Sequence, residues 1–142
     1  MTKAVNFEAE KIVDFHSALG ESPVWDHKTN RLYWVDYTDR KINCYDYERR
    51  SSRCFELDVT PGCVAPTENG KLFLGYGNDI GLYDMESGKL TTLFSPEKGK
   101  DYNHFNDGKC DAAGRMWIGS ITEEQTWPGA ALYKGEGKKS CQ

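Results

Sequence analysis

The chain has 142 residues, a formal net charge of -4 and an aromatic content of 13%, and its pI is about 5.4. This size and composition indicate one globular domain, and the acidic balance with scattered basic residues argues against a nucleic-acid-binding surface. The N-terminus lacks the apolar core of a signal peptide, and no apolar run approaches the roughly 18 residues that span a membrane. We therefore expect a cytoplasmic protein with no membrane or nucleic-acid partner.

Three segments with a shared pattern predict strands at a regular interval along the chain. Each segment starts at an acidic residue, passes through a turn containing Asn or Gly, and continues from Arg or Lys into an apolar and aromatic run. The segments are 26–36 (DHKTNRLYWVD), 68–78 (ENGKLFLGYGN) and 111–121 (DAAGRMWIGSI). With Arg31, Lys71 and Arg115 taken as equivalent, the intervals are 40 and 44 residues.

A second strand is predicted after each of these segments, with Tyr45, Tyr83 and Tyr133 at corresponding positions, and pieces such as 51–57 (SSRCFEL) supply an outer strand. Short strands between Gly, Asn and Asp turns, with no 3.6-residue apolar period, predict an all-β fold. A repeat of about 40 residues built from four strands has the size of one β-propeller blade. A β-sandwich is the alternative, but it does not require turns that recur at nearly constant spacing.

The length of the chain conflicts with a closed propeller. The smallest ring has about four blades of about 40 residues, or roughly 160 residues. The repeats predict two to three blades of four-stranded antiparallel sheets in an open ring, at about 22–57, 63–96 and, incomplete, 105–142. We therefore expect residues 1–142 to be the N-terminal part of one larger propeller domain.

The five cysteines are odd in number and show no C-x-x-C spacing, which argues against a zinc site or a complete disulfide framework. The cysteines are interpreted as reduced thiols; Cys44 and Cys54 lie symmetrically about the polar turn 48–52 (ERRSS), which leaves open whether they face each other across a hairpin.

Two motifs resemble a known family. LGESPVWD (19–26) followed by RLYWVD, and FNDGKCDAAGRMWIGSITEE (105–124), are similar to the regucalcin, gluconolactonase and luciferin-regenerating enzyme family of six-bladed β-propellers. The resemblance implies a divalent cation, Ca²⁺ or else Zn²⁺ or Mn²⁺, in the central channel. It also implies that the enzymatic members open sugar lactones such as gluconolactone by attack of water.

Glu21 is the candidate metal ligand. From its position alone, between Gly and Ser-Pro before a strand, it could be an exposed loop carboxylate. A hard cation such as Ca²⁺ prefers carboxylate oxygens, and the resemblance implies that Glu21 is a ligand in the complete ring.

The segment HFNDG (104–108) provides two candidate substrate contacts. Its composition predicts a turn in which Asn106 and Asp107 bond their own backbone and Gly108 supplies a positive φ. The resemblance implies that Asn106 contacts the substrate, and its amide can both donate and accept hydrogen bonds. Many family members have Arg at the position of His104, so His104 is either a substrate contact with a different preference or a plain loop residue.

The acidic pair in ITEEQTWPG completes the candidate set. On its own, the pair is typical of solvated loop charge, whereas the resemblance implies that Glu124 closes the substrate pocket. Glu123 receives no role, and Trp127 with Pro128 is interpreted as a lid.

No catalytic residue is predicted within the chain. The resemblance implies two further ligands, an Asn and an Asp that also acts as general base, and neither has a counterpart before Gln142. Three functions stay open: a metal-dependent sugar-lactone hydrolase in truncated form, a calcium-binding regulatory propeller, and an inactive truncated product.

Overall fold

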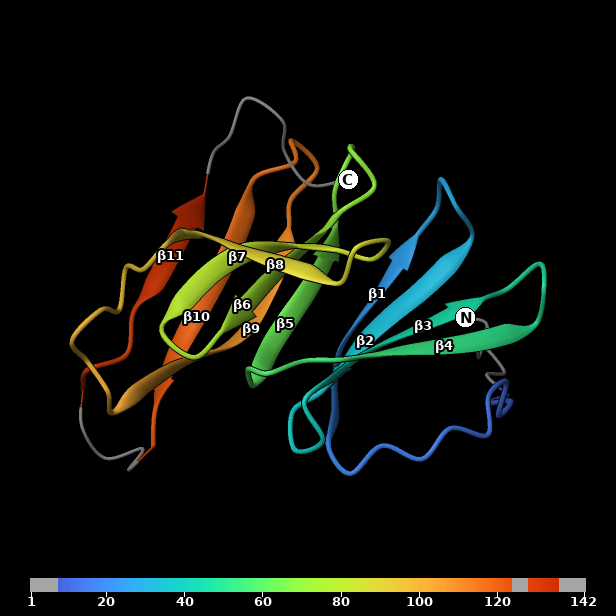
Figure 1. Cartoon of the computed structure of the whole chain (residues 1–142), viewed down its shortest axis with the longest axis horizontal. Helices are drawn as coiled ribbons and strands as arrows, with labels where there is room; N and C mark the ends of the chain where they lie inside the picture. Colours follow the sequence, from blue (N-terminus) through green and yellow to red (C-terminus); the bar gives the residue numbers. More distant parts are fainter. Residues whose placement is uncertain (1–7, 124–127, 136–142) are drawn as a thin grey trace, which may run out of the picture.

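The computed structural model describes residues 8–123 and 128–135, and within these ranges the chain forms eleven strands and no helix. The strands make three antiparallel sheets that stand side by side (Figure 1). The first sheet has the order β1 (Gly20–Asp26), β2 (Arg31–Asp36), β3 (Lys41–Asp46), β4 (Ser51–Glu56).

The second sheet repeats this arrangement with β5 (Pro61–Pro66), β6 (Leu72–Tyr76), β7 (Asp79–Asp84) and β8 (Lys89–Phe94). The third contains β9 (Asn103–Cys110), β10 (Met116–Thr122) and β11 (Leu132–Gly135), with β10 in the centre. In the described residues no helix is long and apolar enough to cross a membrane.

Aspartates at strand ends close many of the hairpins. Asp26 accepts a hydrogen bond from the backbone N–H of Lys28 at 2.9 Å, and Asp46 accepts one from the N–H of Arg49 at 3.0 Å. In such turns the aspartate side chain accepts a hydrogen bond from a backbone N–H that would otherwise need a backbone carbonyl as its acceptor. Arg50 closes the second of these turns in the left-handed region, at a φ of 49°.

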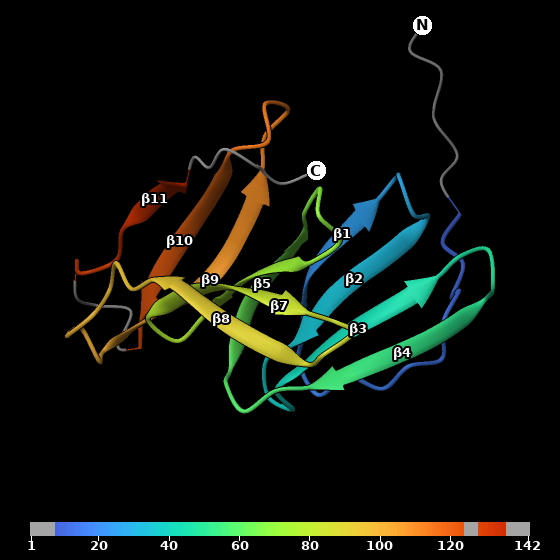
Figure 2. The same ribbon diagram turned by 45° about the horizontal axis from the view of Figure 1, so that its top comes forward.

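The second sheet stands between the first and the third (Figure 2). The apolar core lies between neighbouring sheets, and the second sheet contributes to both of its halves. Side chains alternate between the two faces of a strand, so a strand that is covered on both faces needs apolar residues at consecutive positions. In β6 all five residues are buried. The half between the first and second sheets comprises Tyr33, Val35, Ile42, Cys44, Val64, Leu72, Leu74, Tyr76 and Tyr83. The half between the second and third comprises Cys63, Ala65, Phe73, Ile80, Phe105, Met116 and Ile118.

The predicted all-β fold, built from repeated antiparallel sheets in an open ring, is confirmed. Cys44 and Cys54 do not face each other across the hairpin, a point that the sequence left open: Cys44 is in register with Arg53, and Cys54 is in register with Asn43. A shift of one position places the two thiols on opposite faces of the sheet. The assignment of the ranges 22–57, 63–96 and 105–142 to blades of one domain stays a prediction.

The backbones of β5 and β9 approach each other closely where the second and third sheets meet. A Cβ atom at Gly62 would lie 2.0 Å from the carbonyl oxygen of Phe105 and 2.6 Å from its carbonyl carbon. Because the obstacle is backbone, no rotation of a side chain can relieve it. Glycine at position 62 is therefore required for the sheets to meet at this distance.

The substitution Gly62→Ala should lower the free energy of unfolding by about 2 to 3 kcal/mol, since it overpacks a contact between two backbones. Gly119→Ala is the matched control, because a Cβ there would meet its nearest atom, the Asp107 carbonyl oxygen, at 3.9 Å. Urea denaturation of both variants measures the difference. Equal stability of the two variants would contradict the close approach.

Candidate functional site

A small cavity lies between the first half of β1 and the middle of β9. Its volume is about 290 Å³, and it is lined by Glu21, Ser22, Pro23, Asn106, Asp107 and Lys109. The two strands belong to the first and third sheets, and β5 of the second sheet contacts both of them. The fold therefore brings the predicted metal ligand and one predicted substrate contact to the same cavity.

A β-bulge shapes the β1 side of this cavity. The register with β2 shifts between Glu21 and Val24, and Ser22 has a φ of 54°. Pro23 has no N–H to donate, so it suits an irregular position where the ladder is interrupted. The hydroxyl oxygen of Ser22 accepts a hydrogen bond from the backbone N–H of Val64 at 3.4 Å, which joins the bulge to β5.

A second bulge shapes the β9 side, and it corrects the prediction of a turn at HFNDG. Asn106 and Asp107 lie inside β9, where the register with β10 shifts between Ile118 and Ser120. The Asp107 carboxylate accepts a hydrogen bond from the N–H of Gly108 at 2.8 Å, so part of the expected local bonding is present.

Gly108 lies in a closely packed position and does not have the positive φ that a turn would need. A Cβ atom there would lie 2.5 Å from Cε of Met116 and 3.0 Å from Sγ of Cys63. The bulge lets two consecutive polar residues reach the cavity, which a regular strand would not allow because its side chains alternate. The turn that the sequence predicts next, at Asp111 to Gly114, is present: the N–H of Gly114 donates to the Asp111 carbonyl at 2.9 Å, and Gly114 has a φ of 75°.

The cavity offers oxygen ligands of the kind that a hard divalent cation prefers. Glu21 and Asp107 supply carboxylates, Asn106 supplies an amide oxygen, and Lys109 adds one positive charge. Ca²⁺ takes about 6 to 8 oxygen ligands, so these groups fit its chemistry but do not complete its coordination. Among the described residues no group of three or more His, Cys, Asp and Glu side chains is placed to hold a metal ion.

The predicted substrate contact His104 does not line the cavity. His104 lies on β9 opposite Ile121, and its ring packs on Tyr37 with 5.7 Å between the ring centroids. Glu124 and Trp127 fall outside the described residues. Glu123 is exposed, and Pro128 is exposed beside a described turn.

Sequence reasoning missed the cavity-lining roles of Ser22, Pro23, Asp107 and Lys109. All four belong to the two motifs that carry the family resemblance. Each is close in sequence to Glu21 or Asn106, and this closeness could have identified them as residues of the same site. The periodicity of apolar residues in the sequence does not reveal where a strand bulges. The bulges decide which neighbouring side chains line the cavity.

A buried carboxylate that the sequence did not single out anchors the start of β9. Glu97 is fully buried in the connection from β8. It accepts hydrogen bonds from Asn103 Nδ2 at 3.1 Å, from the Ser120 hydroxyl at 2.8 Å and from the Tyr133 hydroxyl at 2.7 Å. These donors lie on all three strands of the third sheet, and Lys100 adds an ion pair at 2.8 Å. The Glu97 network thus fixes the strand that presents Asn106.

The pKa of Glu97 reflects this network. Burial alone raises the pKa of a carboxyl group, but the hydrogen bonds from Lys100, Tyr133, Asn103 and Ser120 outweigh burial and lower the value to about 2. Glu97 is therefore charged in the folded protein at neutral pH, and Lys100 and the hydrogen-bond donors around it stabilise that negative charge.

The three antiparallel sheets contact their neighbours through their first strands, and a polar site lies between these strands. This arrangement defines an incomplete β-propeller. Residues 19–142 match the family model described as SMP-30/Gluconolactonase/LRE-like region. The chain belongs to this family.

Two relatives agree with this membership, and a solved structure agrees with the fold. The chain is 36% identical to regucalcin of Gallus gallus over 106 residues, which are 75% of this chain and 36% of that protein. It is 28% identical to 6-deoxy-6-sulfogluconolactonase of Pseudomonas putida over 126 residues, or 89% of this chain and 43% of that protein. The crystal structure of a calcium-binding protein, regucalcin, from Agrobacterium tumefaciens superposes with a TM-score of 0.80 at 21% identity, covering 92% of this chain and 44% of that one.

The chain therefore spans less than half the length of these relatives. The structural match supports the fold: the three sheets are part of a six-bladed β-propeller whose ring is not closed, as the sequence predicted.

Replacing Glu97 by Gln should destabilise the protein most at neutral pH. The folded-state pKa lies below the ordinary value of 4.5, so the contribution is complete above that value and is lost as the pH falls towards 2. The expected loss of unfolding free energy at neutral pH is about 3 kcal/mol, since each pKa unit corresponds to about 1.4 kcal/mol.

Urea denaturation of the native protein and the Glu97→Gln variant between about pH 7 and pH 2.5 tests this expectation. The difference in stability should shrink as the pH decreases. A gap that stays constant over the whole range would show that the shape of the side chain matters and its charge does not.

Proposed function

We propose that this chain carries the metal-binding Glu and the substrate-binding Asn of a metal-dependent sugar-lactone hydrolase. The observation that supports this proposal is the cavity that Glu21 and Asn106 share, although the two residues lie in different sheets. The family membership and the lactonase relative from Pseudomonas putida point to the same reaction class.

The proposed roles follow from the chemistry of the side chains. The Glu21 carboxylate binds a divalent cation, Ca²⁺ or else Zn²⁺ or Mn²⁺, and the bound cation would polarise the lactone carbonyl. The Asn106 amide donates to and accepts from the hydroxyl groups of the sugar. His104 and Glu124 are kept as proposed substrate contacts. Asp107 and Lys109 border the same space and set its charge.

Hydrolysis requires more than these residues supply. A general base must lie within hydrogen-bond reach of the attacking water, and we assign none of the described residues to that role. We therefore propose that the 142-residue chain is inactive by itself and that turnover belongs to a longer form with further blades.

Calcium-dependent regulation without turnover is the second candidate function. The observation that favours it is the likeness to regucalcin from Gallus gallus and to a structure described as a calcium-binding protein. The same Glu21 would then bind the cation without a reaction following.

Gluconolactone hydrolysis, measured with and without Ca²⁺, Zn²⁺ or Mn²⁺, separates these functions. We expect no turnover above buffer by the 142-residue chain and metal-dependent turnover by a longer form. In that form Glu21→Gln should reduce turnover at least about 100-fold, because the cation loses a carboxylate ligand. Glu68→Gln is the matched control, since Glu68 is exposed in the turn between β5 and β6.

Each alternative outcome has a defined meaning. Metal binding that Glu21→Gln abolishes, without turnover by the longer form, would establish the regulatory function instead. Full turnover by the 142-residue chain would refute the assignment of an incomplete site.

A further inference from the structure

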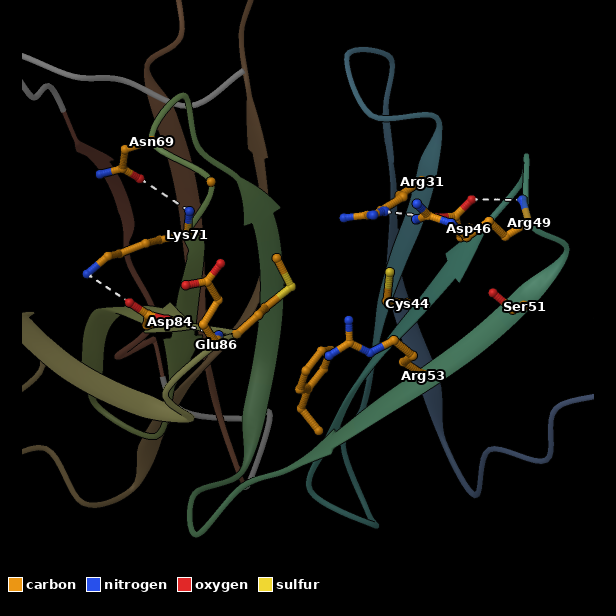
Figure 3. Close-up of a pocket in the computed structure, with 13 residues that line it drawn as sticks. Arg31, Cys44, Asp46, Arg49, Ser51, Arg53, Asn69, Lys71, Asp84 and Glu86 are labelled. Atoms are coloured by element: carbon orange, nitrogen blue, oxygen red, sulfur yellow. Dashed lines mark hydrogen bonds and ion pairs between the residues drawn. The ribbon is translucent and has the colours of Figure 1, made fainter.

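A second and larger cavity lies between the first and second sheets, and the proposed function does not use it (Figure 3). We call it the arginine cleft. Its volume is about 590 Å³, which is within the range of small-molecule sites. Its lining comes from both sheets and includes Arg31, Cys44, Arg53, Phe55, Lys71 and Asp84.

The arginine cleft opens at the other end of the first sheet from the candidate lactone site. Glu21 pairs with Val35 near one end of the β1 and β2 pair, whereas Arg31 pairs with Asp26 at the opposite end. On the next strand, Asp46 is in register with Arg31. A ligand in the arginine cleft would therefore not compete with a ligand at Glu21.

Two guanidinium groups flank the buried thiol of Cys44 on the wall formed by the first sheet (Figure 3). Cys44 is in register with Arg53 on β4, while Arg31 comes from β2 on its other side. Burial raises the pKa of the Cys44 thiol, and the charges of Arg31 and Arg53 both oppose that rise.

The carboxylates of the cleft leave part of this positive charge uncompensated. Asp46 is shared by two arginines, at 3.3 Å from Nε of Arg31 and 3.0 Å from Nη1 of Arg49. Arg53 stacks on Phe55, 5.1 Å from the ring centroid, and forms no ion pair with a described residue. The stacking holds the guanidinium in place without using its hydrogen-bond donors.

The opposite wall adds a lysine and two acids. Lys71 forms an ion pair with Asp84 at 3.4 Å, and Glu86 lies beside them (Figure 3). The lining thus contains four cationic side chains against three acidic ones, although the chain as a whole has a net charge of -4. The excess positive charge lies on the wall formed by the first sheet, where three arginines meet the single carboxylate of Asp46.

We propose that the arginine cleft binds the phosphate group of a small phosphate monoester between Arg31 and Arg53. Guanidinium groups match phosphate oxygens with paired, charge-assisted hydrogen bonds, and a doubly charged anion offsets the repulsion between two neighbouring cations. The cleft is larger than phosphate alone requires. Phe55 and Met85 offer apolar surface, and Ser51, Asn69 and Glu86 offer hydrogen bonds to a hydroxylated body such as a sugar.

Titration calorimetry of the 142-residue chain with glucose 6-phosphate, inorganic phosphate and glucose tests this proposal. Glucose 6-phosphate should bind more tightly than inorganic phosphate, and glucose should not bind. Arg53→Gln should weaken glucose 6-phosphate binding at least about 10-fold, because a charge-assisted contact is lost. Arg53 is exposed on β4, so this variant should keep the fold, which circular dichroism verifies.

Arg40→Gln is the matched control, because Arg40 is an exposed arginine in the turn between β2 and β3, at the far end of the first sheet. Its affinity for glucose 6-phosphate should stay within about twofold of the native value. The proposal is overturned if the native protein binds neither phosphate compound below about 10 mM. It is also overturned if Arg53→Gln and Arg40→Gln weaken binding equally, since that would indicate a general charge effect.

Discussion

The packing of neighbouring sheets face to face is the interaction on which the rest of the structure depends. The second sheet has apolar side chains on both faces, with Leu74 turned towards the first sheet and Phe73 towards the third. Such a sheet is stable only when both faces are covered, because exposed apolar area on this scale is unfavourable in water. The close contact of β5 with β9 at Gly62 shows how little space the packing leaves.

The two sites arise from this packing at opposite ends of the sheets. Where the first strands meet, bulges in β1 and β9 turn polar groups into a small cavity between sheets one and three. At the other end the first and second sheets diverge, and arginines from β2 and β4 line the larger cleft. Each site is lined by residues from two sheets, so its shape depends on the angle between those two sheets. The polar network around Glu97 holds the start of β9, the strand that presents Asn106 to the cavity.

Much of the fold could be predicted because its signals are local. Recurring acidic turns, alternation of apolar residues and aromatic runs at intervals of 40 and 44 residues specify hairpins and their repetition. The Asp111 turn was predicted correctly for the same reason. The HFNDG segment was misread because a Gly after Asn-Asp is equally typical of a turn and of a bulge beside a crowded neighbour. Met116 and Cys63, the neighbours that crowd Gly108, are known only from the folded chain.

The sequence by itself determined the all-β class, the repeated sheets, the open ring and the motifs that contain Glu21 and Asn106. Tertiary structure alone decided that these two residues share a cavity and that His104 packs on Tyr37 outside it. It also decided that Cys44 is in register with Arg53 and not with Cys54. The physical reason is that turns and strand alternation depend on neighbours along the chain. Strand register, bulges and the meeting of sheets depend on residues far away in sequence, and a shift of one position reverses which face a side chain occupies.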